Sequence, residues 1–171
     1  MPIMAQICQF CLRSGILCPE CQKKVKAGKV TKLDLEVARL LLSMEKKYPP
    51  LQELRFYKAV ETDKILALVV GKGDVARLLS YGGKIIKELG NKMGRSIRVL
   101  EYGSSSRKFL EDLFAPLNIV TINKIWLPDG TTETRVILKK KGRHSTSFKM
   151  EALKEIAKKV RGITLRIEFA N

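Results

Sequence analysis

Four cysteines within the first 21 residues are the side chains of this chain best suited to chemistry. They form two CxxC pairs, Cys8-Gln-Phe-Cys11 and Cys18-Pro-Glu-Cys21, which the six residues LRSGIL separate. Two such pairs joined by a short loop can present four thiolates tetrahedrally to one metal ion, and zinc commonly takes four sulfurs. Gly15 permits the tight reversal that so short a loop requires. The spacing predicts a structural zinc site made by Cys8, Cys11, Cys18 and Cys21, with no open position for catalysis.

Other uses of the four cysteines fit the pattern less well. Disulfides are disfavoured in a reducing cytosol, and a redox-active CxxC pair normally begins a helix within a larger α/β context. An iron–sulfur cluster is a further alternative, although short paired CxxC knuckles are more typical of zinc. A segment this small cannot bury a core, so we expect it to need a metal to fold. The basic run QKKVKAGK after Cys21 is either a phosphate contact or a solvated linker.

The segment VVGKGDVARLLSYGGKIIK at residues 69–87 places glycines after an apolar, strand-like run. A mononucleotide P-loop needs GxxxxGK[ST], and Gly71-Lys72-Gly73 has neither that spacing nor the hydroxyl residue after a Gly-Lys pair. A dinucleotide-binding turn needs GxGxxG, and Ala76 takes the place of the third glycine. Both nucleotide sites are therefore disfavoured, and we interpret Gly71 to Gly73 as a structural turn from strand to helix.

A second glycine turn, Ser80-Tyr81-Gly82-Gly83, lies between two helix-like pieces of the same segment. A KH module has a GxxG loop in this position. Its small residues let a nucleic-acid backbone approach, and the next helix presents N–H groups to phosphate. Ser80 replaces the first glycine, and a left-handed φ there would cost a serine about 1 kcal/mol. Tyr81 either stacks on a base or lies against the loop. The loop therefore either binds nucleic acid or persists for the fold alone.

Basic residues accompany this loop and gather again near the C-terminus. Residues 139–161 contain nine basic and two acidic residues, a net charge of +7, and open with the loop KKKGRHSTSF. A basic loop leading into a basic helix suits phosphate contact without base recognition, and the alternative is a solvated surface. His144, the single histidine, is interpreted as a surface residue. The candidate RNA-binding residues are Lys72, Ser80, Tyr81, Gly82, Gly83, Lys84, Lys87, Lys139, Lys140, Lys141 and Arg143.

Two similar runs of elements are predicted to position these residues. Hydrophobic periodicity predicts an amphipathic helix at 31–48, with Thr31 as its N-cap and two prolines as its stop. The first run then has strands at 55–60 and 65–70, helices at 74–79 and 84–93, and a strand at 95–102. After the linker GSSS, the second has a helix at 106–114, strands at 118–127 and 132–138, a helix at 148–160 and a strand at 163–169. The order predicts an α+β protein with a zinc knuckle (1–28) and two modules (29–103 and 104–171), each a three-stranded sheet covered by helices.

The composition bounds the function. The 171 residues include 33 Lys and Arg against 17 Asp and Glu, a net charge of +16 that favours a polyanionic partner. No apolar run is long enough to span a bilayer, and the N-terminus lacks the features of a signal peptide, so we expect a cytoplasmic protein. One histidine, no spare cysteine and no framed carboxylate pair leave little for acid–base or nucleophilic catalysis. We therefore expect a binding protein and not an enzyme.

The sequence resembles the archaeal NusA-like KH proteins with an N-terminal zinc knuckle over almost its whole length. The resemblance is carried by the paired CxxC motifs, by YGGKIIKEL at residues 81–89 and by APLNI at 115–119. It implies type II KH folds, with the second module degenerate, and single-stranded RNA binding. It also implies a role in transcription elongation or termination, with RNA polymerase as a possible partner.

Two other function classes share these sequence features. A ribosome-associated or ribosome-assembly protein would also be basic, would also carry a zinc knuckle and KH modules, and could dock a damaged GxxG loop on structured rRNA. A protein–protein adaptor that has lost RNA binding would retain the fold. The charge of +16 argues against the adaptor, because surface basicity without a polyanionic partner has no evident use.

Overall fold

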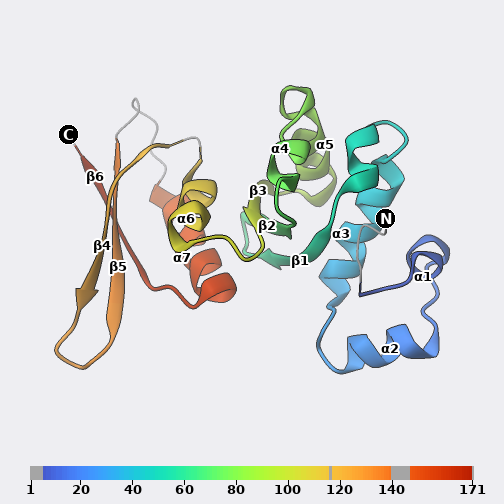
Figure 1. Cartoon of the computed structure of the whole chain (residues 1–171), viewed down its shortest axis with the longest axis horizontal. Helices are drawn as coiled ribbons and strands as arrows, with labels where there is room; N and C mark the ends of the chain where they lie inside the picture. The colour runs from blue at the N-terminus through green and yellow to red at the C-terminus, as the bar shows by residue number, and fades with distance from the viewer. Residues whose placement is uncertain (1–5, 116, 140–146, 171) are drawn as a thin grey trace. The chain divides into compact units, whose positions relative to one another are not determined.

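The computed structural model describes residues 6–115, 117–139 and 147–170. It is an α+β fold with two three-stranded sheets, as the sequence predicts (Figure 1). The chain divides into two compact units, Met1–Ala59 with Leu66–Gly103 and Val60–Ile65 with Ser104–Asn171. None of the helices in the described part combines the length and apolar character that a membrane span needs.

The first unit places helices around a sheet with strand order β1-β2-β3 (Figure 1). Every residue of the central strand β2 is buried, which suits its unbroken apolar sequence. The elements in chain order are α1 (Gln9–Ser14), α2 (Pro19–Lys26), α3 (Lys32–Met44), the 3-10 helix η1 (Pro49–Glu53), β1 (Phe56–Glu61), β2 (Ile65–Val70), α4 (Asp74–Leu78), the 3-10 turn η2 (Tyr81–Gly83), α5 (Lys84–Met93) and β3 (Ser96–Glu101).

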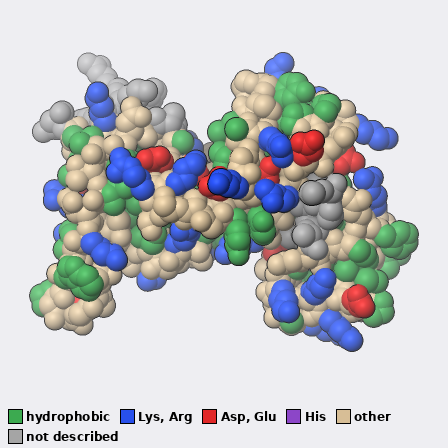
Figure 2. Space-filling model, viewed as in Figure 1, with side chains coloured by type: hydrophobic (Ala, Val, Ile, Leu, Met, Phe, Trp, Pro, Cys, Tyr) green, Lys and Arg blue, Asp and Glu red, His purple; other side chains and the backbone are tan. Residues whose placement is uncertain are grey.

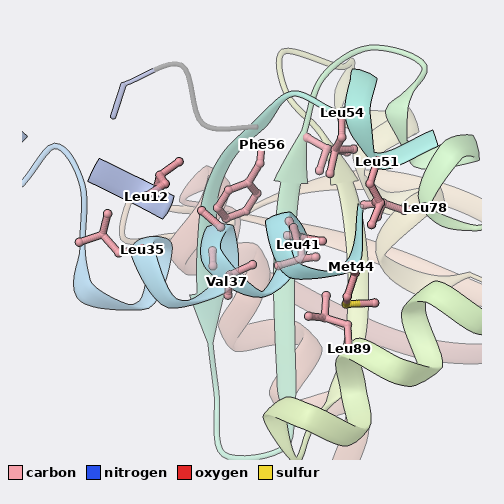
Figure 3. Packing of buried hydrophobic residues seen from close by; sticks show 14 of the residues in the cluster. Leu12, Leu35, Val37, Leu41, Met44, Leu51, Leu54, Phe56, Leu78 and Leu89 are labelled. Carbon is pink, nitrogen blue, oxygen red and sulfur yellow. The ribbon is translucent and has the colours of Figure 1, made fainter. Parts of the chain in front are cut away.

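Helix α3 is the scaffold of this unit. Its buried face includes Val37, Leu41 and Met44, which Figure 3 shows facing Phe56 of β1 and Leu89 of α5. Burying an aliphatic side chain of this size contributes roughly 1.5–3 kcal/mol. This packing holds α3, β1 and α5 together and so fixes the elements on both sides of the glycine loop.

A capping box starts α3 at the residue that the sequence predicts. The Thr31 hydroxyl accepts the Asp34 backbone N–H at 3.1 Å, and the Asp34 carboxylate accepts the Thr31 N–H at 2.9 Å. The other oxygen of the buried Asp34 carboxylate accepts the Ala59 N–H of β1 at 2.7 Å. The cap therefore also ties the helix to the sheet.

Replacing the cap residue in Thr31→Ala is expected to lower the free energy of unfolding by about 1 kcal/mol, because one helix N–H loses its acceptor. Denaturant unfolding followed by circular dichroism measures the change. The control is Ser43→Ala, since the Ser43 hydroxyl only donates to the Leu40 carbonyl of its own helix (2.6 Å) and is exposed. Equal stability of the two variants would contradict a role for the cap.

The predicted helix at 31–48 is too long in the structure. It ends at Met44, the Glu45 N–H then bonds to the Leu42 carbonyl at 3.3 Å, and Tyr48 turns its ring into the core. Tyr48 precedes Pro49, and a residue before proline is disfavoured in helical geometry. Its φ of −125° and ψ of 88° are accordingly non-helical, and η1 follows.

The second unit consists of α6 (Ser106–Phe114), β4 (Ile119–Trp126), β5 (Thr132–Lys139), α7 (Ser147–Arg161) and β6 (Leu165–Ala170). Its sheet has the order β4-β5-β6, with β4 antiparallel and β6 parallel to β5. The paired residues Val136 and Ile167 lie on the same face, and Arg135 and Glu168 form an ion pair at 2.6 Å. Phe109 and Leu113 of α6 and Ile156 of α7 are fully buried. Each of the five predicted elements is present, the helix at 106–114 with both ends as predicted and the others with ends that differ by at most two residues.

Candidate metal centre and nucleic-acid interface

The four cysteine sulfurs converge on one point of the N-terminal segment. All four lie within 4.8 Å of one another. The Sγ atoms of Cys8 and Cys11 are 2.9 Å apart, and those of Cys8 and Cys21 are 3.8 Å apart. A tetrahedral zinc ion with bonds of about 2.3 Å would separate its sulfurs by about 3.8 Å. The four sulfurs therefore fit a single tetrahedral ion after small adjustments, and the geometry does not by itself identify which ion.

Two short helices that the sequence analysis did not predict bring the cysteines together. Cys8 is the N-cap of α1 and Cys18 is the N-cap of α2, so each pair places one cysteine before a helix and one in its first turn. Gly15 ends α1 with a φ of +79°, which confirms the tight reversal expected between the pairs. Because both pairs begin helices, their position no longer argues against redox-active CxxC motifs. The convergence of four sulfurs is what favours a metal.

Hydrogen bonds within the cluster distribute its protons unevenly. The sulfur of Cys8 contacts the Cys11 thiol and raises its pKa to about 12. The backbone N–H of Cys21, followed by the neighbouring thiols, lowers the pKa of Cys18 to about 7. A bound cation would replace the remaining protons, since thiolates and not thiols ligate metals.

The cysteine segment also shares a hydrophobic core with the first sheet, contrary to expectation. Ile7, Cys11, Leu12 and Cys21 are buried and belong to the same apolar cluster as α3 and β1. Arg13 of α1 adds an ion pair to Glu45 at 3.1 Å. A segment of this size cannot bury a core alone, but here it packs on the neighbouring module. Apolar packing on α3 is therefore a second source of stability for this segment, beside any metal.

The Ser80–Gly83 loop takes a conformation that depends on its glycines. Tyr81, Gly82 and Gly83 have φ values of +58°, +64° and +84°. A Cβ on Gly82 or Gly83 would meet no atom within 4 Å. These glycines are therefore required by backbone geometry and not by packing inside the protein, and their outer surface is open to a partner.

The expected strain lies one residue further along than the sequence analysis placed it. Ser80 has a φ of −66° in extended geometry, so the substitution of the first glycine costs no left-handed strain. Its hydroxyl donates to the Arg77 carbonyl at 2.5 Å and closes α4. Tyr81 instead is the one non-glycine residue with positive φ in the described part of the chain. Such a residue costs roughly 1–2 kcal/mol unless its surroundings stabilise it.

The loop opens the N-terminus of α5, where phosphate recognition is predicted. The N-cap Gly83 makes no side-chain cap, and the first turn contains no acidic residue. Lys84 and Lys87 in this turn are both exposed. N–H groups without a side-chain cap, the positive end of the helix dipole and two cations favour an anion. The structure thus brings Ser80, Tyr81, Gly82, Gly83, Lys84 and Lys87 together.

The first glycine turn has a plain structural explanation. A Cβ on Gly71 would lie 2.7 Å from the Asp74 carboxylate, and the Gly71 N–H donates to the Arg55 carbonyl at 2.9 Å. The Gly73 N–H donates to the Glu101 carboxylate at 3.3 Å, and this negative charge disfavours phosphate there. Lys72 is exposed in this turn, at the opposite end of α4 from Ser80. It is therefore not brought into the loop.

The basic C-terminal candidates are described only in part. Lys139 ends β5 and is exposed. Lys140, Lys141, Arg143 and His144 lie outside the described residues. Figure 2 shows lysine and arginine side chains on the visible face of both units, with acidic side chains among them.

Arg77 and the residues around it were missed from the sequence. Its guanidinium donates to the fully buried Asp74 carboxylate at 2.9 Å and to the Glu53 carbonyl at 3.1 Å, and it pairs with the Glu53 carboxylate at 3.0 Å. Three acceptor atoms, from Asp74 and Glu53, therefore hold the Arg77 guanidinium in place. The Asp74–Arg77 spacing of i, i+3 is a signal for the ion pair, whereas the η1 contact has no sequence signal.

Comparison with known proteins gives partial matches. The chain is 31% identical over 68 residues to "Probable transcription termination protein NusA" of Methanocaldococcus jannaschii, which is 40% of this chain and 36% of that protein. It is 30% identical over 57 residues to the protein of the same description from Methanococcus vannielii, 33% of each chain. The matches thus span about a third of the length of these curated relatives, and no family model matches.

Over this part of its length the chain is therefore similar to archaeal NusA proteins. The crystal structure of APE1850 is similar over 82% of this chain and all of that chain, with a TM-score of 0.53 and 19% identity. At this identity the likeness concerns the fold alone.

Proposed function

We propose that this protein is a single-stranded RNA-binding accessory factor of transcription elongation or termination. Its first unit would be a type II KH module, its second a degenerate module of the same kind, and its cysteine cluster a structural zinc site. The observation that carries the proposal is the loop at 81–83, in which three consecutive left-handed residues open the uncapped N-terminus of α5. This geometry suits a phosphodiester backbone.

The element order supports the KH assignment. Helix α3 and strand β1 precede the run β2, α4, loop, α5 and β3, which places a tight loop between two helices on one three-stranded sheet. The similarity to archaeal NusA proteins supports RNA, and through it RNA polymerase, as partners. The proposal assigns no catalytic role. Within the described residues, the cysteines are the single group of three or more potential metal ligands.

Zinc is the ion best suited to the cluster. Four thiolates with no oxygen or nitrogen donor favour a thiophilic ion in tetrahedral geometry. The sulfurs of Cys8, Cys11, Cys18 and Cys21 would hold it. It would supply cross-links between α1 and α2 and no Lewis-acid chemistry, because all four positions would be filled.

RNA binding is expected to weaken steeply with salt. A strand that contacts three phosphates should show log K falling by about 2 per log unit of salt, at roughly 0.7 per phosphate. Fluorescence anisotropy with a 12-nucleotide single-stranded RNA at several salt concentrations measures this slope. In Lys87→Gln the slope should fall by about 0.7, whereas Lys46→Gln, an exposed lysine outside the loop, should leave it unchanged. A slope near zero in the wild type would refute RNA binding.

The cellular role requires a separate measurement. Copurification of the tagged protein from cell extract should recover RNA polymerase subunits. Recovery of a ribosomal subunit instead would replace the transcription role by ribosome association. Neither result would alter the assignment of the RNA-binding loop.

A further inference from the structure

A pocket of about 710 Å³ lies beside the Ser80–Gly83 loop, and the phosphate-binding role leaves it unused. Its walls come from two elements, the 3-10 helix η1 and the C-terminal half of α4 with the loop. The volume falls within the range of about 300–1,000 Å³ that small-ligand sites occupy. The lining side chains that carry the argument are Pro49, Pro50, Gln52, Glu53, Arg77 and Tyr81.

The two walls of this pocket are fixed by packing. Leu51 of η1, Leu54 directly after it and Leu78 of α4 are fully buried, and Figure 3 shows the three side chains lying together. Arg77 of α4 forms an ion pair with Glu53 of η1, and its guanidinium also donates to the buried Asp74 carboxylate. The pocket is therefore built on the core of the first unit and does not need to form on binding.

Flat surfaces are the common chemical feature of the lining. The rings of two prolines and of Tyr81 offer flat apolar surfaces. The Arg77 guanidinium is a planar cation that stacks well on aromatic rings. Gln52 is exposed and the Glu53 side chain is 74% exposed, so both offer hydrogen-bonding groups at the rim. This combination suits a planar heteroaromatic ring with polar edges.

The strained backbone of Tyr81 supports the same conclusion. Its left-handed φ of +58° would suit glycine better, yet a tyrosine stands there. Its ring meets the buried Tyr48 edge-on, with centroids 5.6 Å apart, and remains 49% exposed. The contact with Tyr48 fixes the ring at the mouth of the pocket. Strain of this kind at an exposed aromatic residue points to a ligand contact.

We propose that this pocket binds a nucleobase of the RNA strand, with Tyr81 and Arg77 as its stacking surfaces. The inference rests on the proposed function, because the phosphates next to this base would lie on Gly82, Gly83 and the start of α5. One residue, Tyr81, joins the two sites, so a strand crossing the loop brings a base to the pocket. The loop then contributes base stacking as well as backbone contact.

The test compares a 12-nucleotide single-stranded RNA with an abasic strand of the same length and charge. The wild type is expected to bind the base-containing strand about tenfold more tightly, since stacking on an aromatic side chain contributes about this factor or more. In Tyr81→Gly the ratio of the two affinities should fall to about one, because only the base-containing strand loses a stacking partner. Thermal stability should change little, because relief of the positive φ offsets the lost edge-on contact with Tyr48. Tyr81→Phe should bind as the wild type does.

A matched control and an independent readout keep the outcomes apart. Phe10→Ala removes an aromatic side chain that is 76% exposed in α1 and should leave both affinities unchanged. Photo-crosslinking of a 5-iodouridine strand to the wild type should label Tyr81 or the 49–53 segment. Equal loss of both affinities in Tyr81→Gly, no loss of either, or crosslinks solely elsewhere would overturn the base pocket and leave the phosphate loop standing. Failure of the wild type to bind either strand would refute the proposed function itself.

Discussion

Loss of metal from the four-cysteine cluster is expected to destabilise the whole first unit and not the N-terminal segment alone. Cys11 and Cys21 are buried in the same apolar cluster as α3 and β1, so a change at the sulfurs reaches the sheet. We expect Cys11→Ser to lower the free energy of unfolding by roughly 3–5 kcal/mol. This loss is smaller than the metal-binding free energy of ~10–16 kcal/mol in isolated zinc-finger peptides, because the apolar packing of the segment on α3 remains. For a unit of this size the melting temperature should fall by about 10–20 °C.

Two measurements check this expectation. Elemental analysis of protein purified without added metal should give one zinc per chain, and Cys11→Ser should lose it. Differential scanning calorimetry with and without a chelator should reproduce the loss in melting temperature for the wild type. Ser14→Ala is the control, since Ser14 is exposed in the same helix and is not one of the proposed metal ligands. Iron in place of zinc would favour the iron–sulfur alternative, and intact thiols without any metal would remove the site.

A metal-free protein with an unchanged melting temperature would have a different meaning. It would show that the contacts of Ile7 and Leu12 with the α3 core hold the segment without help. The ion would then serve to shape the surface of α1 and α2 and not to fold them. Such a result would be consistent with the packing of the segment on α3, which an isolated knuckle lacks.

Strong local signals explain why the element order could be predicted from sequence. The apolar run Ile65–Val70 and the interval Lys84–Met93 match the structure at both ends, because the flanking glycines and polar turns are unambiguous. Thr31 followed by Asp34 is a recognisable capping box. The convergence of the cysteines followed from their spacing alone.

Features that depend on tertiary contact could not be predicted in this way. Nothing local shows that the cysteine segment packs on α3, since its apolar residues are too few to display a period. Comparison with the GxxG pattern predicted backbone strain at Ser80. In the structure the first residue with left-handed φ in this loop is Tyr81. The pocket formed by η1 and α4 joins residues 24 positions apart through Arg77 and the Glu53 carbonyl. Sequence patterns carry no information about such a contact.

Replacing one glycine of the loop should separate RNA binding from folding. In Gly83→Asp, a carboxylate would stand at the N-cap of α5, where the backbone meets phosphate in the proposed complex. We expect RNA affinity to fall by about 30- to 100-fold. The aspartate carboxylate would repel the RNA phosphate, in place of the phosphate's attraction to the helix N–H groups, which is roughly 2–3 kcal/mol. Equilibrium binding of a 12-nucleotide RNA at low salt measures the loss.

The stability of the same variant should change little, because two effects oppose each other. A φ of +84° costs a non-glycine residue about 1–2 kcal/mol. The negative charge of aspartate at the helix N-terminus returns roughly 0.3–1 kcal/mol of this cost. Gly83→Ala carries the backbone cost without the charge, so it should be the less stable variant and yet retain more RNA affinity. If Gly83→Asp binds RNA as the wild type does, the loop is structural and the second unit must carry the contact.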